Sequence, residues 1–420
     1  MDRLIKNNIN NRGLLIGLLF FSQIVTASNS CVVPLQLVNV RSSTAPEYKL
    51  GIYVGLGGGS PQFYELDTGG AGFWAAYNAE PPKKKGQWWG SYEMVQPDAL
   101  NITYTSGNQY IANLVKTEVA LYKRERFKYS KVCGSSESLG VAQISSYKNQ
   151  LKPSAQKDWY NALAKGKAPL FGRFYGDFGA ALFPVMTSDN SYGIYSILPQ
   201  LPQDNLTNGF IIHVGPLNKA KPTLTIGITD EDRAKFKTQL PMNQACQKIP
   251  GDVTAPVVGC IPYPPFPISN MPTWSEQVTN ANLSWNYKSS HQIESQAFEN
   301  IGLTIDTGAP STTLWQNNQL FVNPQFLIKP KGTAIPYAGN LKSKVRFSMR
   351  APTLVGGGED LDFNLVTGQK STINQIAASV RKNDGGPTWS GYMNTGLMLF
   401  THYDVMFDVE NGLVGFRAIK

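Results

Sequence analysis

Residues 63–74 read FYELDTGGAGFW and residues 301–315 read IGLTIDTGAPSTTLW, and this pair of segments decides the fold. Each begins with residues typical of a β-strand, continues with Asp-Thr-Gly and small residues, and ends in a tryptophan. A single Asp-Thr-Gly is a weak indication, because the tripeptide turns up by chance in roughly one such chain in ten. Two copies in the same local setting predict two related halves that each present one aspartate, Asp67 and Asp306.

The repeated tripeptide suggests the chemistry of a carboxylate pair. In each copy a strand delivers the aspartate, the glycine (Gly69 or Gly308) allows a sharp turn, and the threonine (Thr68 or Thr307) can brace the matching loop. If the loops meet across a pseudo-twofold axis, the two carboxylates share one proton, because both cannot ionise side by side. The ionised member can then take a proton from a water while the protonated member polarises a peptide carbonyl. The alternative is two ordinary Asx turns in unrelated hairpins.

The composition of the whole chain favours an all-β architecture. Of the 420 residues, 42% are hydrophobic and 16% are charged, which is enough apolar material for sizeable cores. Glycine and proline are scattered, and no long stretch has helical apolar spacing. We therefore expect many short strands joined by turns, arranged in one large two-lobed unit.

Further segments show a resemblance to the pepsin family of aspartic peptidases. Residues 47–55 resemble the opening strand of that family, residues 223–230 the strand that closes its first lobe, and residues 396–416 its C-terminal hairpin. The resemblance implies a bilobal double β-barrel with a central cleft and pseudo-twofold symmetry. The lobes would span residues 28–228 and 229–420.

The resemblance also implies a flap over the cleft. Trp74 lies seven residues after the first aspartate, where the family has a tryptophan, and residues 100–107 resemble the flap hairpin. Tyr104 would be the flap tyrosine, which in the family contacts that tryptophan and covers the substrate. The alternative is that Tyr104 is an ordinary strand aromatic.

Several positions depart from the family pattern. The family has Ser or Thr three residues after each catalytic aspartate, and Gly70 and Ala309 stand there instead. Because a hydroxyl donor favours the charged carboxylate, its loss predicts a higher pKa for the pair and an optimum in mildly acid or near-neutral solution. Near Asp177, the family's strand requires a glycine where this chain has Ala181, whereas residues 394–396 keep the glycine but lose its apolar neighbours.

The N-terminus has the layout of a signal peptide. Arg3, Lys6 and Arg12 precede the apolar residues 13–25, which are too few to span a bilayer, and small residues follow up to Ala27. We expect residues 1–27 to be removed after that alanine and the protein to be secreted or periplasmic. An uncleaved anchor is the alternative. Since few residues precede the first predicted strand, no pro-segment is expected, and activity should appear directly after cleavage.

The four cysteines fit an oxidising compartment. Cys246 and Cys260 close a short proline-rich loop and are the favoured disulfide, which leaves Cys31 with Cys133. Four cysteines allow three pairings, so the other two remain open.

Metal and serine chemistry find little support in the sequence. His213, His291 and His402 are too dispersed for a metal-ligand motif, and no G-x-S-x-G elbow occurs. We expect neither a metal nor an organic cofactor, and a monomer that binds a peptide or protein substrate and keeps no membrane insertion once the leader is removed.

One basic segment could suggest another partner. The net charge is +9, and Lys83, Lys84 and Lys85 lie close to Trp88 and Trp89, a combination that can bind nucleic acid. A solvated loop is the favoured interpretation, so no nucleic-acid partner is expected.

Two other functions remain open. A pepsin-fold protein that only binds or inhibits a partner is the first alternative. The intact aspartates argue against it, while Gly70 and Ala181 favour it. A secreted β-sandwich with an accidental Asp-Thr-Gly pair is the second, and its two aspartates would lie far apart.

Overall fold

A computed structural model describes most of the chain. The described residues are 30–41, 46–79, 88–104, 106–126, 128–203, 206–247, 261–288, 293–316, 326, 339–353, 358–367, 377–380 and 392–419. The predicted leader, Lys83 to Lys85, Cys260 and His291 lie outside them. Within these ranges, no helix has the length and apolar character needed to span a bilayer.

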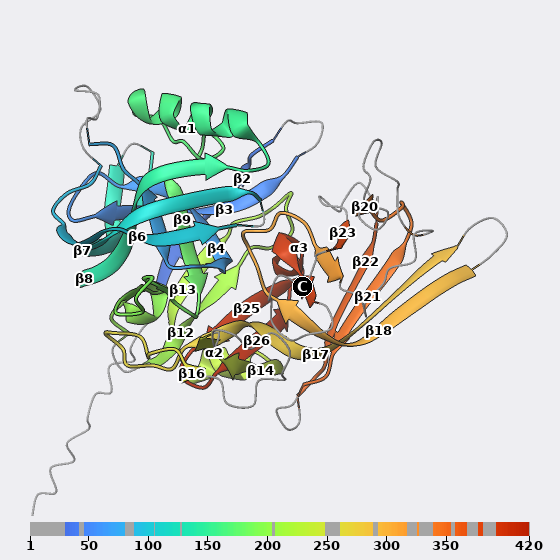
Figure 1. Cartoon of the computed structure of the whole chain (residues 1–420). Coiled ribbons are helices and arrows are strands. Elements are labelled where there is room, and N and C mark those ends of the chain that lie inside the picture. Colours follow the sequence, from blue (N-terminus) through green and yellow to red (C-terminus); the bar gives the residue numbers. More distant parts are fainter. Residues whose placement is uncertain are drawn as a thin grey trace, which may run out of the picture.

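The first lobe is an eight-stranded sheet that curls back on itself (Figure 1). Its strand order is β2-β3-β4-β9-β5-β8-β7-β6, and an additional β3–β7 pairing closes the sheet. The strands are β2 (Gln36–Asn39), β3 (Tyr48–Leu56), β4 (Gln62–Ala71), β5 (Phe73–Ala76), β6 (Glu93–Thr103), β7 (Asn108–Glu125), β8 (Lys128–Asn149) and β9 (Gly176–Ala181).

A second sheet of fourteen strands carries the rest of the fold. Its main order is β1-β13-β12-β25-β26-β14-β17-β18-β24-β19-β23-β20, with β21 and β22 added through β17. The strands are β1 (Cys31–Pro34), β12 (Thr207–His213), β13 (Thr223–Ile228), β14 (Thr238–Gln244), β17 (Trp274–Lys288), β18 (Ile293–Thr304), β19 (Thr313–Gln316), β20 (Gly339–Asn340), β21 (Arg346–Ala351), β22 (Leu361–Val366), β23 (Ala377–Val380), β24 (Tyr392–Asn394), β25 (Tyr403–Asp408) and β26 (Leu413–Ala418).

Strands from both halves of the sequence share this second sheet. β12 pairs antiparallel with β25, and Phe210 stacks on Phe407 across the joint with ring centroids 4.8 Å apart. The hairpins β17–β18 and β21–β22 extend to the other side of this joint from the first lobe (Figure 1). The all-β, bilobal prediction is therefore confirmed.

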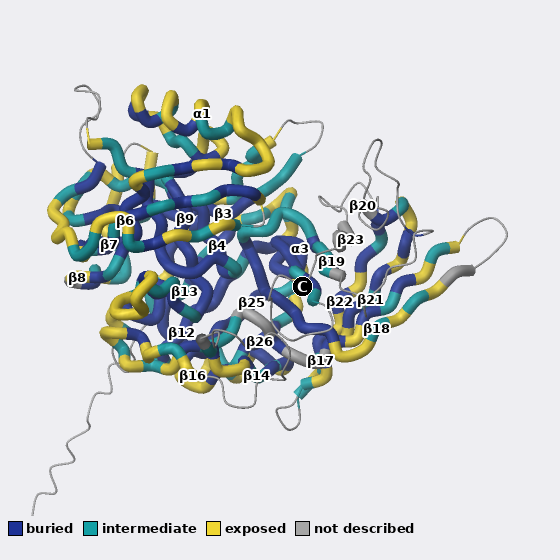
Figure 2. Tube along the Cα trace, viewed as in Figure 1, coloured by how far each residue is buried: buried dark blue, intermediate teal, exposed yellow. Residues whose placement is uncertain are grey.

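The burial of the strands follows their place in the fold. In β22 buried and exposed residues alternate, as expected for a sheet with one face in solvent. In β4, by contrast, every residue from Tyr64 to Thr68 is buried, because both faces of this strand are covered (Figure 2). β4 thus brings the first Asp-Thr-Gly into the interior.

The described residues outside the two sheets form short elements. These are β10 (Val185–Met186), β11 (Gly193–Ile194), β15 (Cys246–Gln247), β16 (Ile261–Pro262), α1 (Pro153–Ala164), η1 (Leu198–Gln200), α2 (Asp230–Ala234) and α3 (Gly396–Phe400). Helix α1 was not predicted from the sequence, because only Trp159 and Leu163 of its residues are buried. Two apolar residues four apart make too narrow a stripe for a periodicity argument.

One predicted disulfide is present. Cys31 and Cys133 are bonded, with Cα atoms 5.4 Å apart, which ties β1 of the second sheet to β8 of the first lobe. This confirms the pairing. The favoured pairing of Cys246 with Cys260 falls on a residue outside the described ranges.

Candidate active site

The two Asp-Thr-Gly loops meet, and their threonines hold them together. The Thr68 amide donates to Thr307 Oγ1, and the Thr307 amide donates to Thr68 Oγ1, both at 3.0 Å. Each hydroxyl in turn donates, at 2.7 Å, to the carbonyl that precedes the opposite aspartate: Thr68 to Ile305 and Thr307 to Leu66. All four bonds cross from one loop to the other, so the threonines fix the position of each loop relative to its partner.

The glycines bring the two carboxyl groups together. A Cβ added at Gly69 would lie 2.5 Å from Cγ of Asp306, and one added at Gly308 would lie 2.2 Å from Cγ of Asp67. Side chains cannot approach that closely, so only glycine lets each loop pack directly against the carboxyl group of the other. Burial first and then the charge of the neighbouring Asp306 raise the pKa of Asp67, as expected for two adjacent carboxyl groups.

Each aspartate is held by its own loop in the same way. Oδ1 of Asp67 accepts from the amides two and three residues further along the chain, at 2.8 and 3.0 Å. Oδ1 of Asp306 accepts from the corresponding amides at 2.6 and 3.1 Å. Both residues are 9% exposed. The inner face of the pair is therefore nearly symmetric.

The pairing of β9 with β4, the strand of the first loop, differs from the sequence prediction. β9 runs parallel to β4 and places Gly179, not Ala181, opposite Asp67. A Cβ at Gly179 would lie 2.3 Å from the carbonyl oxygen of Gly72, so this is the position that requires glycine. The expectation at Ala181 was wrong because the sequence match was shifted by two residues, and the supposed departure from the family pattern disappears.

The outer oxygens of the aspartates have different neighbours. Asn394, on β24, donates from Nδ2 to Oδ2 of Asp306 at 2.5 Å. A Cβ at Gly70 would lie 3.0 Å from Oδ2 of Asp67 and 3.0 Å from Oδ2 of Asp177, so the Asp177 carboxyl group borders the position where a family serine would begin. Gly70 and Ala309 predict that both outer donors are missing. On the Asp306 side that was wrong, because Asn394 supplies one.

A buried ion pair lies directly behind the first loop. Lys49 and Glu65 form a salt bridge, and Nζ of Lys49 also donates to the carbonyl oxygen of Gly308 at 2.6 Å. Burial acts to lower the pKa of Lys49, but the charge of and hydrogen bond to Glu65, followed by the charges of Asp67 and Asp306, raise it overall. Lys49 is therefore charged, and it connects the first lobe to the second Asp-Thr-Gly loop.

Burial and crowding shift the pKa values on the first side of the site. The pKa of Asp67 is raised well above its usual range by burial first, then by the charges of Asp306, Asp177 and Glu65. The pKa of Asp177 is also well above its usual range, again chiefly through burial and then through Glu65. This side of the site thus favours protonated carboxyl groups.

Tyr104, predicted from the resemblance to be a flap tyrosine, packs on Tyr110. Tyr104 follows β6 at the turn to β7, and its ring packs on Tyr110, with centroids 5.7 Å apart. Tyr110 in turn contacts Trp74 at 6.0 Å, while the Trp74 indole N–H donates to the Ala71 carbonyl oxygen at 2.9 Å. The implied Tyr104–Trp74 contact is thus replaced by one through Tyr110.

Helix α1 supports this aromatic group from outside, which the sequence analysis missed. Trp159 stacks on Tyr147 with centroids 4.4 Å apart and contacts Tyr110 at 5.7 Å. A cluster of four aromatic rings therefore connects the helix to the predicted flap: Trp159, Tyr147, Tyr110 and Tyr104. No local pattern reveals this, since the four rings come from α1, β8, β7 and the turn between β6 and β7.

Other candidate residues lie away from the aspartates. Trp88 and Trp89 are buried, and both indole groups donate to the Ala76 carbonyl oxygen, at 3.0 and 2.8 Å, so these rings are core residues. His213 pairs with Asp404.

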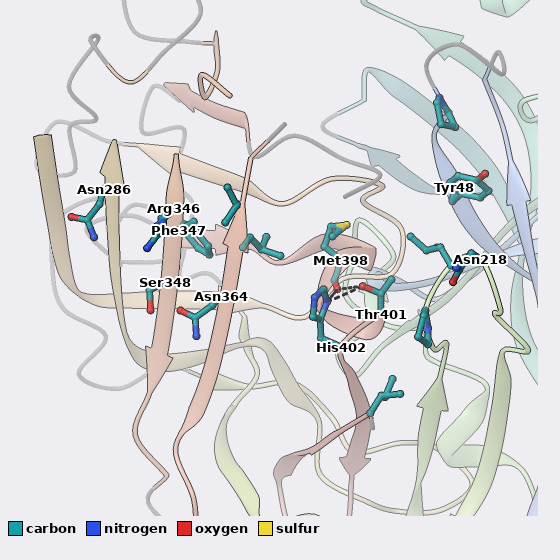
Figure 3. A pocket seen from close by; sticks show the side chains of 16 residues that line it. Tyr48, Asn218, Asn286, Arg346, Phe347, Ser348, Asn364, Met398, Thr401 and His402 are labelled. Atoms are coloured by element: carbon teal, nitrogen blue, oxygen red, sulfur yellow. Dashed lines mark hydrogen bonds between the residues drawn. The ribbon is translucent and has the colours of Figure 1, made fainter. Parts of the chain in front are cut away.

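A cavity of about 1160 Å³ lies between the lobes (Figure 3). Tyr48 and Asn218 line it from the first-lobe side, and Arg346, Asn364 and His402 line it from the other. Neither Asp67 nor Asp306 is among its lining residues within the described part of the chain. We place the candidate site at the aspartates, because the cavity brings together no comparable set of reactive groups.

Comparison with known proteins establishes the fold. The chain is similar to the crystal structure of the aspartic proteinase from Irpex lacteus, with 14% identity and a TM-score of 0.51 over 93% of this chain and 98% of that one. No protein-family model matches, and no curated protein matches. The pepsin-like bilobal architecture is thus shown, and the activity has to be argued from the site.

Proposed function

We propose that this protein is an exported aspartic endopeptidase in which Asp67 and Asp306 activate a water molecule. One observation carries the proposal: two Asp-Thr-Gly loops from distant parts of the chain pack glycine against carboxyl group in both directions. An accidental pair of Asx turns would have no reason to exchange four threonine hydrogen bonds. The pepsin-like fold supports the same function.

The reaction needs one proton on the pair. The ionised carboxylate takes a proton from the water, whose oxygen forms a bond to the peptide carbonyl carbon. The protonated carboxyl group gives its proton to the carbonyl oxygen as the C=O π bond opens. In the second step the carboxyl group that took the water's proton gives it to the leaving nitrogen, and the C–N bond breaks. A hydroxyl of the diol returns a proton to the other aspartate, which is by then a carboxylate. Atoms and charge balance with water as the only co-reactant.

The surroundings fit a peptide substrate and an exported enzyme. Tyr104 lies at the turn of the long β6–β7 hairpin with its hydroxyl buried near Asp177, and a tyrosine in this place can cover an extended chain. The Cys31–Cys133 disulfide suits an oxidising compartment, in agreement with the predicted leader. The chemistry assigned to the pair requires neither a metal nor an organic cofactor.

The test is hydrolysis of denatured proteins from acid to neutral pH, with and without a statine-type inhibitor. We expect cleavage that the inhibitor blocks, and we expect Asp306→Asn to lower kcat/KM by about 10²–10⁴-fold. The isosteric amide keeps the fold but cannot take the water's proton. Asp360→Asn, on a surface ion pair with Arg350, is the matched control and should retain activity.

A binding or inhibitor protein is the second candidate, and Gly70 favours it because no hydroxyl follows Asp67 at the usual position. A folded protein that binds the statine-type inhibitor and cleaves nothing across the pH range would support this alternative over the peptidase.

A further inference from the structure

Asp177 and Asn394 occupy matching places in the two halves of the site. β9 runs parallel to β4 with Asp177 opposite Glu65, two residues before the first aspartate. β24 runs parallel to β18 with Asn394 opposite Thr304, two residues before the second. In both cases a glycine follows two residues later: Gly179 within β9, and Gly396 at the start of α3. The two side chains are therefore equivalent by position and differ only in chemistry: one is a carboxyl group, the other an amide.

The amide stabilises the charged form of its aspartate. Nδ2 of Asn394 donates to Oδ2 of Asp306, while Oδ1 of Asn394 accepts from the Gly396 amide at 2.9 Å, which fixes the orientation of the amide group. A hydrogen bond donated to a carboxylate oxygen favours ionisation. Asp306 thus receives three donated bonds, two from its own loop and one from β24.

The carboxyl group has the opposite effect on Asp67. Asp177 is 4% exposed, and its Oδ1 has no hydrogen-bond partner among the described residues. An ionised Asp177 repels a charge on Asp67, and after burial and the charge of Asp306 this repulsion is the next cause that raises the pKa of Asp67. The carboxyl group at this position therefore disfavours a second negative charge beside that of Asp306.

The other groups that face Asp177 do not reverse this preference. Glu65 adds negative charge, and Lys49 opposes it, but Lys49 is already paired with Glu65. The buried Tyr104 hydroxyl beside Asp177 acts to lower the pKa of Asp177, but burial first and the charge of Glu65 second outweigh it. Tyr110 packs against the Tyr104 ring. Four carboxyl groups, including the pair, thus share one ammonium group.

Resting on the proposed function, we propose that Asp177 and Asn394 decide which aspartate holds the shared proton. Asn394 keeps Asp306 as the carboxylate, which accepts the water's proton. Asp177 makes Asp67 the protonated member, which donates to the peptide carbonyl oxygen. Both act as positioning residues through the pair and need not touch the substrate.

The kinetic test compares the pH dependence of kcat/KM in wild type, Asp177→Asn and Asn394→Asp. Asp177→Asn removes an ionisable neighbour of Asp67 and offers it an amide donor that cannot become charged, so the alkaline limb, where the shared proton is lost, should move down by about one pH unit. Asn394→Asp removes the donor from Asp306, so the acid limb should move up by a similar amount. Both changes are isosteric.

The double variant Asp177→Asn/Asn394→Asp exchanges the two groups and sharpens the test. One side again has an amide and the other a carboxyl group, so kcat/KM should exceed that of either single variant. Loss of rate in Asp177→Asn with neither limb moved would show a merely structural role and overturn the proposal. Movement of the acid limb in Asp177→Asn would show that Asp177 acts on the aspartate that must be ionised. Asp67 would then not hold the shared proton, and the proposal would also be overturned.

A second measurement does not depend on catalysis. Infrared spectra in mildly acid buffer report protonated carboxyl groups directly. Asp67→Asn should remove the protonated carboxyl band of the pair, whereas Asp306→Asn should retain it. Asp177→Asn identifies the band of Asp177 itself. Equal spectra for the first two variants contradict the proposal, while the expected spectra from a protein that hydrolyses nothing would reject the peptidase and leave the proton assignment standing.

Discussion

The two Asp-Thr-Gly loops have nearly the same backbone but different supports. Two residues before the first aspartate stands Glu65, in a buried salt bridge with Lys49, and at the corresponding place before the second stands Thr304. The loop hydrogen bonds differ by only a few tenths of an ångström between the two copies. The comparison shows that the fold repeats the geometry of the loop while the surrounding side chains set a different charge on each side.

Removing the ammonium group should have the largest effect on stability. Lys49→Met leaves Glu65 buried and unpaired, which costs about 3–5 kcal/mol in the free energy of unfolding, measured by urea denaturation. The double variant Lys49→Met/Glu65→Leu should recover most of this loss, since it removes both charges. At the matching position, Thr304→Val should cost less than about 1 kcal/mol, because the Thr304 hydroxyl is buried with no hydrogen-bond partner in the described structure. Equal losses of unfolding free energy in Lys49→Met and in Thr304→Val would refute the contrast between the two sides.

Substitution of the two threonines should affect both sides of the site equally, because their hydrogen bonds are equivalent. Thr68→Val and Thr307→Val each leave a buried amide and a buried carbonyl group without partners, at a cost of about 1–3 kcal/mol for each variant. The two losses should agree closely in thermal or urea unfolding. Thr→Ser at the same positions keeps the hydroxyl and serves as the control. A loss confined to one side would show that the loops do not brace each other symmetrically.

The pH dependence of stability should come mainly from the first side. Burial raises the pKa of both Asp67 and Asp177 well above the value near 4 of an unfolded aspartate. The folded state therefore binds more protons than the unfolded state between about pH 4 and those raised values. Stability should rise as the pH falls through this window, by at most about 1.4 kcal/mol per pH unit for each proton.

Asp177→Asn should flatten this dependence, because it removes one of the two groups and lowers the proton affinity of the other. Unfolding curves across the same pH window provide the measurement. A protein that loses stability steadily on acidification from neutral pH would contradict the protonated state assigned to this side.

Restoring the family hydroxyls should have the smallest effect, and an unequal one. Ala309→Ser adds a donor near Asp306, which Asn394 already serves, so the acid limb of the pH–rate profile should move by less than about half a pH unit. Gly70→Ser should change the profile more, since its Cβ would lie 3.0 Å from oxygens of both Asp67 and Asp177. Equal shifts from the two serines would mean that Asn394 does not replace the missing donor.

The sequence predicted the parts of the site that depend on backbone geometry. An Asp-Thr-Gly loop requires a strand, a turn and a close approach of the backbone, and adjacent residues in the sequence determine all three. The charges could not be predicted in the same way, because Lys49 and Glu65 come from two neighbouring strands and Asp177 comes from a third, parallel one. Glu65, an acidic residue within the apolar strand that carries Asp67, was the one available signal. It does not indicate which residue pairs with it.

The hydrogen bond from Lys49 to the Gly308 carbonyl has a mechanical consequence. Together with the four threonine bonds and the β12–β25 pairing, it joins the two halves at the floor of the site. A rigid rotation of one lobe against the other would break the fewest of these bonds if its axis passed through that floor. The floor would then act as the pivot, and the rims on either side would make the larger excursions while the distance between the two aspartates stayed constant.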